Sequence, residues 1–504
     1  MFAMDFIFYI AIACFIMLFG TLDNNIDFDF FARLVVGKSY FQTGNLFNYD
    51  FQSYGTTHQF IDHEWGSSLI FYLVQNYLGD KGLFFLKSAI IFLTIFLITK
   101  IIRLEKKDIK LHFLFFFFIL QTISYSIFST IRCQSFSFLF FVLYLYILKK
   151  AKTDYRILWT LPVLNIIWAN MHGGFVMGLI LILLFAFGEL LNKKPSRPYF
   201  ITFFISCFTT LINPYGFKYI YFIFNALSLN RIHITEWQSA FFSPIFEFSF
   251  LKFKIFFILA LTIFICSVLK NIQLQGIKEF YKNIDKTKYL ILIFTIIIAL
   301  KSSRFHVFFA YMTLSLCYCD FYNIFNKKLP KKTDNIKEIL IAILIFISTI
   351  SHIYDYKFVN TINSKEYPIY CIEFLKINNL KGNLLVNFHF GSYASYKLYP
   401  NIFIYMDGRY EEVYDVKLID KMGEFFLAKN DDLIKKYHTD FIIIDKFYPL
   451  YKKLKTSSDW FLGYESEKFA LFLDKKFQNK NYINPRLDKN YYNNEKFKTE
   501  INWR

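Results

Sequence analysis

The sequence predicts an all-α polytopic transmembrane bundle of about 11–13 spans, followed by a C-terminal extracytoplasmic α/β domain. Three observations support this fold class. Apolar residues make up 55% of the 504 residues and charged residues only 19%, whereas soluble globules are about one-quarter charged. The apolar residues cluster in nearly charge-free stretches close to the roughly 20 residues that cross a bilayer. After about residue 356 the pattern changes to mixed polar and short apolar runs, so we predict a transmembrane domain at 1–355 and a soluble domain at 356–504.

The charge-free stretches place about eleven spans, and the charges between them orient the chain. The predicted spans are 5–22, 83–102, 111–128, 134–148, 157–171, 173–191, 199–213, 254–269, 288–300, 305–322 and 338–355. Lys and Arg cluster in every second connection, at 100–110, 149–156, 193–197, 270–288 and 327–337. Because basic loops stay in the cytoplasm, we predict a multi-pass protein of the inner cell membrane, with a cytoplasmic N-terminus and the C-terminal domain outside. The shorter apolar segments 66–78 and 217–227 are predicted to be interfacial helices, or two further spans.

The charge and the cysteines argue against several other classes. The formal net charge of +18 is spread over the short basic loops that membrane topology produces, so no nucleic-acid partner is expected. Of the seven cysteines, only Cys371 lies in the soluble part, and none has metal-ligand spacing. Neither a zinc site nor a disulfide framework is therefore predicted. The segment 1–20 lacks a basic start and is predicted to be a retained first span, not a cleaved signal.

Carboxylates gather in the long first outer loop, residues 22–64. Asp27 and Asp29 follow the first span closely, and Asp62-His63-Glu64 precedes the next apolar run. A carboxylate at the membrane surface can accept a proton from a hydroxyl group or hold a divalent cation. The other interpretation is that these acidic residues are simply solvated. Their grouping in one loop favours a site.

Asp29 lies at the start of a predicted helix at 30–40. The apolar side of this helix is expected against the membrane, and its residues are Phe30, Phe31, Leu34 and Val35. The dipole of a helix N-terminus favours an ionised carboxylate, which is the form that a general base needs. In the alternative interpretation, Asp29 only caps the helix.

Four further polar side chains fall on the predicted outer face. Arg304 lies between two apolar stretches, where its planar guanidinium can bind a phosphate through two parallel hydrogen bonds or extend toward the lipid headgroups. Arg132 is open to the same two interpretations. His172 precedes two glycines, which alone explain a break between helices. Glu236 is either a ligand contact or a solvated acid beside Trp237 as an interfacial anchor. Because these residues converge on one face, we interpret them as one site.

The C-terminal part alternates helices and strands. Strands are predicted at 383–388, 402–405, 441–444 and 469–473, and helices at 370–375, 392–398, 418–428 and 431–437. This alternation is typical of a small open α/β sheet. Asp407 and Arg409 follow the second strand, where such sheets place ligand contacts. In the alternative interpretation, these two side chains pair with each other.

Several motifs together carry a family resemblance. They are Asp27-Phe-Asp29-Phe-Phe-Ala-Arg33, Asp62-His63-Glu64-Trp65, Arg132-Cys133-Gln134, Trp168-Ala-Asn-Met-His172-Gly-Gly174, Asn213-Pro-Tyr-Gly216, Arg304-Phe305 and Met406-Asp-Gly-Arg409. Over most of its length the chain resembles a large group of bacterial membrane proteins that are similar to the GT-C glycosyltransferases, in particular those of the dolichyl-phosphate-mannose transferase type. It departs from the pattern at Cys133, where a proline is expected. It also lacks the Trp-Trp-Asp motif of the oligosaccharyltransferases, so transfer to asparagine is not expected.

The resemblance implies a hexosyltransferase that uses a polyprenyl-phosphate-linked sugar. An acceptor hydroxyl, deprotonated by Asp29 with Asp27 as its partner, would attack the anomeric carbon with inversion, and Arg304 would bind the leaving phosphate. The other implied substrate-binding residues are His63, Glu64, His172, Arg132 and Glu236. A divalent cation, Mg²⁺ or Mn²⁺, is optional, with Asp27 and Asp29 as its candidate ligands. The soluble domain would cover or select a glycan or protein acceptor.

Two non-enzymatic alternatives remain: a transporter in envelope glycan export and a non-catalytic assembly component with the same fold. A transporter would place ionisable residues deep in its spans and carry internal repeats with broken helices. The polar residues here lie toward one face, and no repeat is visible in the sequence. The enzyme is therefore the favoured hypothesis.

Overall fold

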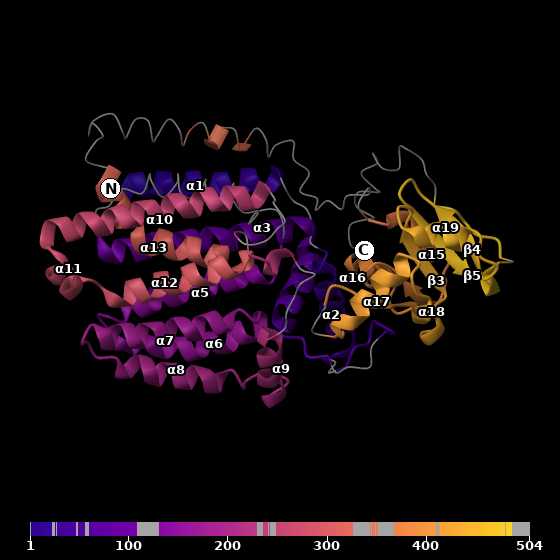
Figure 1. The fold of residues 1–504 in the computed structure, drawn as a ribbon, viewed down its shortest axis with the longest axis horizontal. Helices are drawn as coiled ribbons and strands as arrows, with labels where there is room; N and C mark the ends of the chain where they lie inside the picture. The colour runs from indigo at the N-terminus through magenta and orange to yellow at the C-terminus, as the bar shows by residue number, and fades with distance from the viewer. Residues whose placement is uncertain are drawn as a thin grey trace. The chain divides into compact units, whose positions relative to one another are not determined.

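The computed structural model is mostly helical and contains a sheet near the C-terminus, as the sequence predicted (Figure 1). It describes residues 2–22, 26, 28–46, 49–55, 60–107, 131–228, 235–239, 241, 248–325, 343, 345–347, 349, 350, 367–409, 413–478 and 480–485. The chain forms two compact units. Unit 1 comprises Met1–Asp23, Phe84–Asn213 and Asn230–Lys357, and unit 2 comprises Asn24–Leu83, Pro214–Leu229 and Phe358–Arg504. The predicted span at 111–128 and most of that at 338–355 lie outside the described residues.

Unit 1 is built from helices that lie side by side (Figure 1). They are α1 (Phe2–Leu22), the later part of α3 (Trp65–Glu105), α5 (Gln134–Lys150), α6 (Thr160–Met171), α7 (Phe175–Leu191), α8 (Arg197–Thr209), α10 (Phe248–Gln275), α11 (Ile277–Asn283), α12 (Lys286–Lys301) and α13 (His306–Phe325). α7 packs against α8, α5 and α12, and α13 packs against α10 and α12. The helical character of the corresponding predicted spans is confirmed.

Apolar side chains cover the outside of several of these helices. Phe208 on α8, Ile258 on α10 and Ile297 on α12 are each more than half exposed. Polar side chains instead bond inward, as where Asn165 of α6 donates to the carbonyl of Ser206 at 2.8 Å. Helices with an apolar outside and internally satisfied polar groups suit a lipid environment.

The described helices that are long and apolar enough to cross a membrane are fewer than the spans that the sequence predicted. Among the described residues, α3 alone is long and apolar enough to cross a membrane, or two candidates if the sharply bent pair Phe257–Gln273 and Ile277–Asn283 counts as one span. α3 is itself interrupted at Gly79, whose φ of 63° and ψ of −157° are not helical. It therefore joins the predicted short helix at 66–78 to the predicted span at 83–102. A bundle of about 11–13 spans remains a proposal.

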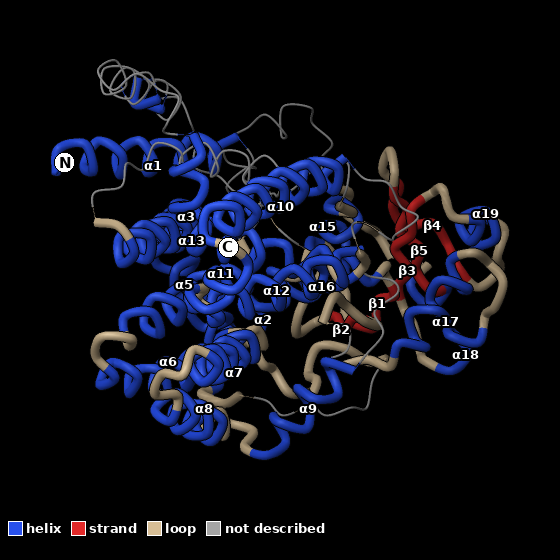
Figure 2. Tube along the Cα trace, turned by 60° about the vertical axis from the view of Figure 1, so that its left-hand side comes forward, coloured by secondary structure: helices blue, strands red, loops and turns tan. Residues whose placement is uncertain are grey.

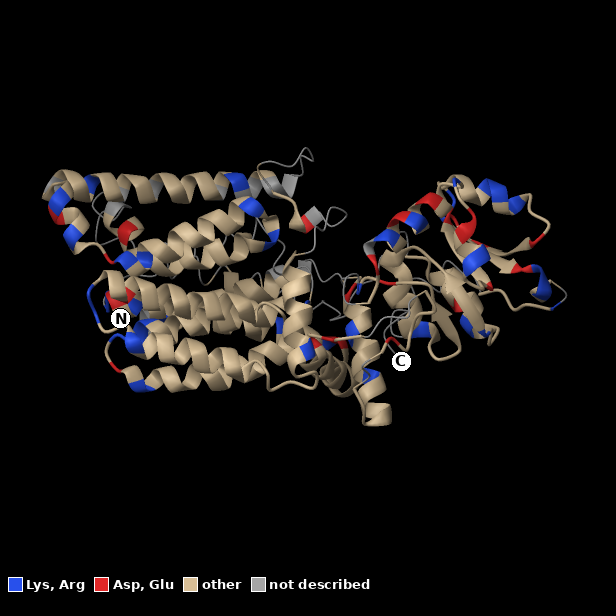
Figure 3. Ribbon diagram, turned by 60° about the horizontal axis from the view of Figure 1, so that its bottom comes forward, with Lys and Arg blue, Asp and Glu red and all other residues tan. Residues whose placement is uncertain are grey.

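Two of the basic connections of unit 1, at 149–156 and 270–288, meet at one end of its helices. Lys152, which follows α5, lies 2.8 Å from Glu189 of α7 and 3.0 Å from Asp285, which precedes α12. In Figure 3, Lys and Arg positions (blue) gather along the ribbon at this end. At the opposite end, Asn170 of α6 donates to the carbonyl of Ile212 at 2.9 Å. Among the described connections, these basic and non-basic loops thus lie at opposite ends of the helices.

Unit 2 contains a five-stranded sheet in the order β2-β1-β3-β5-β4 (red in Figure 2). Its strands are β1 (Gly382–Leu385), β2 (Ile402–Ile404), β3 (Phe441–Asp445), β4 (Trp460–Glu465) and β5 (Phe469–Asp474). β1 is parallel to β2 and β3, with Leu384 aligned to Ile404 on one side and Phe441 on the other, whereas β5 runs antiparallel to β3 and β4. The strands alternate with α15 (Ile369–Ile377), α16 (Phe388–Leu398), α17 (Val416–Phe426), α18 (Asp432–Lys436) and α19 (Pro449–Lys455).

The predicted α/β alternation is confirmed, but sequence analysis missed β4. Gly463 interrupts the alternation of side chains in this strand, and the pairing register with β5 shifts between Leu462 and Tyr464. Glycine inside a strand often marks such an irregularity. β4 therefore lacked the regular pattern by which β3 and β5 were found.

The first loop adds to the free edge of this sheet. Tyr54 N donates to the carbonyl of Ile404 at 2.9 Å, and Ile404 N donates to the carbonyl of Gln52 at 3.1 Å, which forms a parallel bridge between Ser53 and Ile404. Gln52 also shares a hydrogen bond of 3.0 Å with Ser395 of α16. These loop residues therefore pack with C-terminal residues inside unit 2. The domain boundary at residues 355 and 356 stays a prediction.

The helix predicted at 30–40 is α2 (Phe30–Thr43), and it lies inside unit 2. The expectation that its apolar side faces the membrane is wrong, because every residue from Phe30 to Gly37 is buried. Phe30 packs on Phe71 of α3 with ring centroids 5.1 Å apart, and Phe31 packs on Tyr393 of α16 at 5.0 Å. Aromatic partners from distant segments thus occupy the side that the pattern of a single helix assigned to lipid.

Candidate functional site

Asp29, the predicted base, precedes α2. It occupies the N-cap position with φ −75° and ψ −22°, but its side chain makes no capping hydrogen bond. The residue is exposed, and its Oδ1 lies against Gly408: a Cβ built on that glycine would be 2.1 Å from this oxygen. The capping interpretation is therefore wrong, and the carboxylate can be reached from solvent. Asp27 lies outside the described residues.

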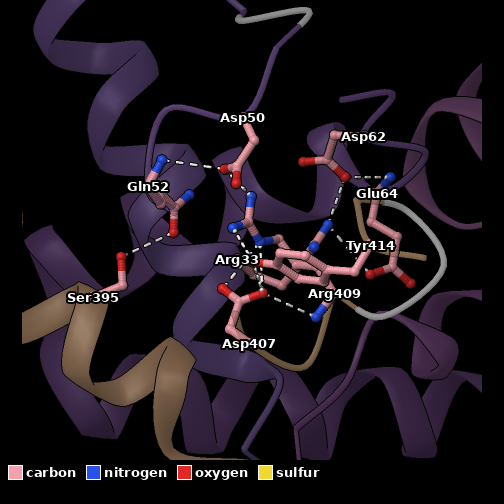
Figure 4. A network of polar contacts seen from close by, with 9 residues as sticks. All are labelled: Arg33, Asp50, Gln52, Asp62, Glu64, Ser395, Asp407, Arg409 and Tyr414. Carbon is pink, nitrogen blue, oxygen red and sulfur yellow. Dashed lines mark hydrogen bonds and ion pairs between the residues drawn. The ribbon is translucent and has the colours of Figure 1, made fainter. Parts of the chain in front are cut away.

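Asp62 and Glu64 pair with Arg33, to which sequence analysis gave no role (Figure 4). Arg33 of α2 is buried, and its Nη1 lies 2.5 Å from Asp62 Oδ1 and 3.4 Å from Glu64 Oε2. Glu64 N donates to Asp62 Oδ1 at 2.9 Å, and His63 Nε2 lies 3.8 Å from Glu64 Oε1. Because a buried cation requires a compensating anion, Asp62 and Glu64 neutralise Arg33. The position of Arg33 inside the apolar run of α2 was the available sequence signal.

Asp407 and Arg409 pair with each other, as one of the two sequence interpretations predicted (Figure 4). Arg409 Nε donates to Asp407 Oδ1 at 2.8 Å and to Oδ2 at 3.0 Å. Its Nη1 donates to Asp50 Oδ1 at 2.9 Å, and its Nη2 to the hydroxyl of Tyr414 at 3.1 Å. All of these side chains are buried, and burial raises the pKa of Asp50 against the opposing effect of Arg409. Two carboxylates around one guanidinium hold the turn after β2 in place.

A second polar cluster, in unit 1, joins three residues that sequence analysis placed on one face. Arg132 Nη1 donates to Glu236 Oε2 at 2.9 Å, and Arg304 Nη1 donates to Glu236 Oε1 at 3.0 Å. The guanidinium of Arg304 lies 4.9 Å from the centre of the Trp237 ring. When the Gln134 amide is oriented to satisfy its partners, its oxygen accepts from Arg304 Nε at 3.0 Å. The cluster is one-quarter to one-third exposed, so a ligand can reach it.

The charges of this cluster favour an ionised Glu236. Burial would raise the pKa of Glu236, but Arg304 and Arg132 together hold it below its usual value, with a smaller contribution from His172. The backbone around Glu236 is held as well, because Ser302 and Ser303 donate to its carbonyl at 3.0 and 2.8 Å. Two guanidinium groups thus share one carboxylate, and the three side chains carry a net charge of +1.

His172 is oriented by neighbours that also determine which ring nitrogen carries its proton. Gly174 N donates to His172 Nδ1 at 2.9 Å, so Nδ1 is an acceptor and Nε2 carries the proton of the neutral ring. Trp168 Nε1 donates to Ser137 Oγ at 2.7 Å, and the Ser137 hydroxyl lies 2.7 Å from His172 Nδ1, to which it donates. A Cβ on Gly174 would be 2.4 Å from Ser137 Oγ. His172 thus presents an Nε2–H donor beside an anionic side chain.

The structure assigns the predicted site residues to two units. Arg132, Glu236 and Arg304 meet in unit 1, and His172 is close enough to affect the pKa of Glu236. The other predicted residues belong to unit 2, namely Asp29, His63, Glu64, Asp407 and Arg409. The partners that sequence analysis did not single out are Arg33, Asp50, Gln134, Ser137 and Tyr414.

The described residues do not form a recognisable metal site. No group of three or more His, Cys, Asp or Glu side chains among them is arranged to hold a metal ion. Asp27, one of the two predicted candidate ligands, is not among the described residues. A cation held by Asp27 and Asp29 stays a prediction.

Comparison with known proteins supports the fold. No protein-family model matches the chain, and no curated protein matches it. Among solved structures, it is similar to the archaeal oligosaccharyltransferase AglB from Archaeoglobus fulgidus, in complex with an inhibitory peptide and a dolichol-phosphate. The TM-score is 0.54 and the sequence identity 9%, over 87% of this chain and 69% of that chain. The two proteins therefore share a fold.

Proposed function

We propose that the chain is a GT-C-like membrane glycosyltransferase, which moves a hexose from a polyprenyl-phosphate-linked donor to an acceptor hydroxyl with inversion. The fold shared with an oligosaccharyltransferase supports a lipid-linked donor. The sequence lacks the Trp-Trp-Asp motif expected of that branch, which favours a hydroxyl over an asparagine as acceptor. The similarity to the dolichyl-phosphate-mannose transferase type is part of this proposal.

The observation that carries the proposal is the cluster of Arg132, Glu236 and Arg304. A departing polyprenyl phosphate gains negative charge as its bond to the sugar breaks, and two guanidinium groups stabilise that charge. Glu236 holds both guanidinium groups in place before a ligand arrives, at 2.9 and 3.0 Å, and the cluster keeps a net positive charge. His172, the further predicted substrate-binding residue of this unit, acts on the same cluster by lowering the pKa of Glu236.

Asp29 is the proposed general base. Its carboxylate is exposed and does not cap α2, which supports a chemical role over the capping interpretation. In the proposed reaction it takes the proton of the acceptor hydroxyl while the hydroxyl oxygen bonds to the anomeric carbon. The bond between that carbon and the phosphate oxygen breaks, and its electron pair leaves with the phosphate. No step requires a metal ion, and Asp27 is proposed as an auxiliary carboxylate.

A multi-pass arrangement in the inner membrane of a bacterium, with the N-terminus in the cytoplasm, is also proposed. It is supported by the exposed apolar side chains of α8, α10 and α12 and by the basic loops at one end of unit 1. α9 (Phe217–Ser228) supports it further, because Phe217, Tyr221 and Phe224 are each at least 70% exposed on one side while Tyr219 and Ile223 are buried. Such a helix suits the membrane interface.

The function is tested on the full-length protein in detergent, with radiolabelled polyprenyl-phosphate mannose as the probe and water or a mixture of saccharides as the acceptor. Wild-type protein is expected to release polyprenyl phosphate. Arg304→Ala is expected to slow that release about 10²–10³-fold. The control is Arg197→Ala, at the exposed first position of α8 in the same unit, which is expected to keep the wild-type rate.

Two results would count against the proposal. Unchanged release by Arg304→Ala would remove the phosphate role of the cluster. Tight binding of polyprenyl-phosphate mannose and polyprenyl-phosphate glucose without turnover of either would favour a transporter or a non-catalytic assembly component.

A further inference from the structure

Gly408 lies in the turn that follows β2, at a place where a side chain would collide with Asp29. A Cβ built on Gly408 would be 2.1 Å from Asp29 Oδ1 and 3.3 Å from its Cγ. The φ of Gly408 is not in the left-handed region, unlike that of Gly382 in the same sheet. The backbone of the turn could therefore accept any L-residue. A side chain at position 408 would therefore act on the Asp29 carboxylate, which would have to move away from its present place.

The turn around Gly408 is rigid on both sides. Asp407 and Arg409 are buried and hydrogen-bonded to each other, and Asp50 fixes the far end of the guanidinium at 2.9 Å. α16 presses on the turn from one side, because a Cβ on Gly391 would lie 2.1 Å from the carbonyl oxygen of Met406. A turn held by buried ion pairs and by close backbone contact makes a firm surface for the carboxylate.

Asp29 is also fixed by its neighbours in sequence. Phe28 stacks on Tyr367 with ring centroids 4.9 Å apart and an angle of 25° between the ring planes. Phe31 packs edge-on against Tyr393 at 5.0 Å. The two phenyl rings are thus anchored to C-terminal residues on either side of Asp29. The backbone of Asp29 cannot shift without breaking these contacts, so the position of its carboxylate depends on the room left by Gly408.

We propose that Gly408 is a positioning residue, which sets the location of the Asp29 carboxylate by leaving space for it over the Asp407-Gly408-Arg409 turn. The C-terminal sheet then supports the catalytic base directly, in addition to any role toward the acceptor. The effect of this contact on catalysis rests on the proposed function of Asp29. The contact between Gly408 and Asp29 is observed whatever Asp29 does.

The contact is tested by cross-linking in the full-length protein. With Asp29→Cys and Gly408→Cys, the two Cβ atoms are near the separation of roughly 3.5–4.5 Å that a disulfide requires. Mild oxidation is expected to produce a linked pair of tryptic peptides, detected by mass spectrometry. Asp29→Cys combined with Gly423→Cys is the control, because nothing lies within 4 Å of a Cβ on Gly423, and it is expected to give no linked pair. Absence of a link at residues 29 and 408 would overturn the proposal whatever the protein catalyses.

The positioning role is tested by kinetics with the polyprenyl-phosphate mannose probe. Gly408→Ala is expected to lower kcat about 10²-fold or more, with KM for the probe unchanged, while Gly423→Ala keeps wild-type kinetics. In an Asp29→Asn background, Gly408→Ala is expected to add no further loss, because both changes act through the same carboxylate.

The outcomes distinguish the role of Asp29 as the base from the role of Gly408 in positioning it. If the cross-link forms but Asp29→Asn keeps wild-type turnover, Asp29 is not the base and both the base assignment and the positioning role are overturned. If Asp29→Asn is inactive but Gly408→Ala keeps the wild-type kcat, only the positioning role is overturned. The positioning role is supported if Asp29→Asn and Gly408→Ala each lower kcat and the double variant loses no more than Asp29→Asn alone.

Discussion

Arg409 Nη1 donates to Asp50 Oδ1 at 2.9 Å, although 359 residues separate the two in sequence. The contact ties the first loop to the turn after β2, and both side chains are buried. Because Asp407 shares the same guanidinium, removal of Arg409 would leave two buried carboxylates without a compensating cation.

Arg409→Met is therefore expected to lower the free energy of unfolding by about 3–5 kcal/mol, the usual loss when one partner of a buried ion pair is removed. The matched control is Lys453→Met, which removes a half-exposed ion pair of 2.6 Å with Asp431 and should lower it by at most about 1 kcal/mol. The measurement is denaturant unfolding of the detergent-solubilised full chain. Similar losses in the two variants would contradict a stabilising role for the buried pair.

Asp29 is expected to matter for turnover and not for helix stability. Asp29→Asn should reduce hexose transfer about 10²–10⁴-fold, since asparagine cannot take a proton. Asp29 makes no capping hydrogen bond to α2, so loss of a helix cap is not expected to contribute to the effect of Asp29→Ala on the thermal midpoint. Asp415→Ala is the contrast: Asp415 caps α17 by accepting from Lys417 N at 3.0 Å, and its removal should cost about 1 kcal/mol. Near-normal transfer by Asp29→Asn would shift the base assignment to Asp27 or Glu64.

Glu236 is expected to make the stability of the folded protein depend on pH. The pKa of Glu236 in the folded protein lies below its ordinary value of 4.5 because Arg304 and Arg132 outweigh burial. A depressed carboxyl pKa contributes stability that is present above the unfolded pKa and is lost as the pH falls through the folded pKa. The stability difference between wild type and Glu236→Gln is therefore expected to be constant near neutral pH and to shrink below about pH 4.5. Thermal unfolding of both proteins between pH 7 and pH 3 would show this, and a difference independent of pH would contradict it.

The proposed topology places the C-terminal region outside the cytoplasm. In a Cys266→Ser background, which removes the one cysteine that is exposed, Ser458→Cys should react with a membrane-impermeant maleimide in intact cells. Lys194→Cys, an exposed position in the basic connection between α7 and α8, is the control and should react only after lysis. The reverse pattern would invert the topology and the assignment of the outer face.

Local patterns in the sequence predicted most of the elements. The span expected at 173–191 is the helix Phe175–Leu191, and the strand expected at 441–444 is Phe441–Asp445. Such elements follow from the spacing of apolar residues, which is read within one short window. β4 was missed because Gly463 and the shifted register break that spacing. α2 was found as a helix but assigned to the membrane, because its burial by Phe71 and α16 is not visible in its own sequence.

The sequence by itself determined the helical class, the α/β alternation and the gathering of Arg132, Glu236 and Arg304 on one face, because the alternation of loops sorts residues between two ends. Only the tertiary structure decided which charges pair and which contacts are close. The pairing of Asp50 with Arg409 joins residues hundreds of positions apart, as does the approach of Asp29 to Gly408. Periodicity reports on neighbours along the chain, whereas an ion pair or a steric contact depends on distance in space.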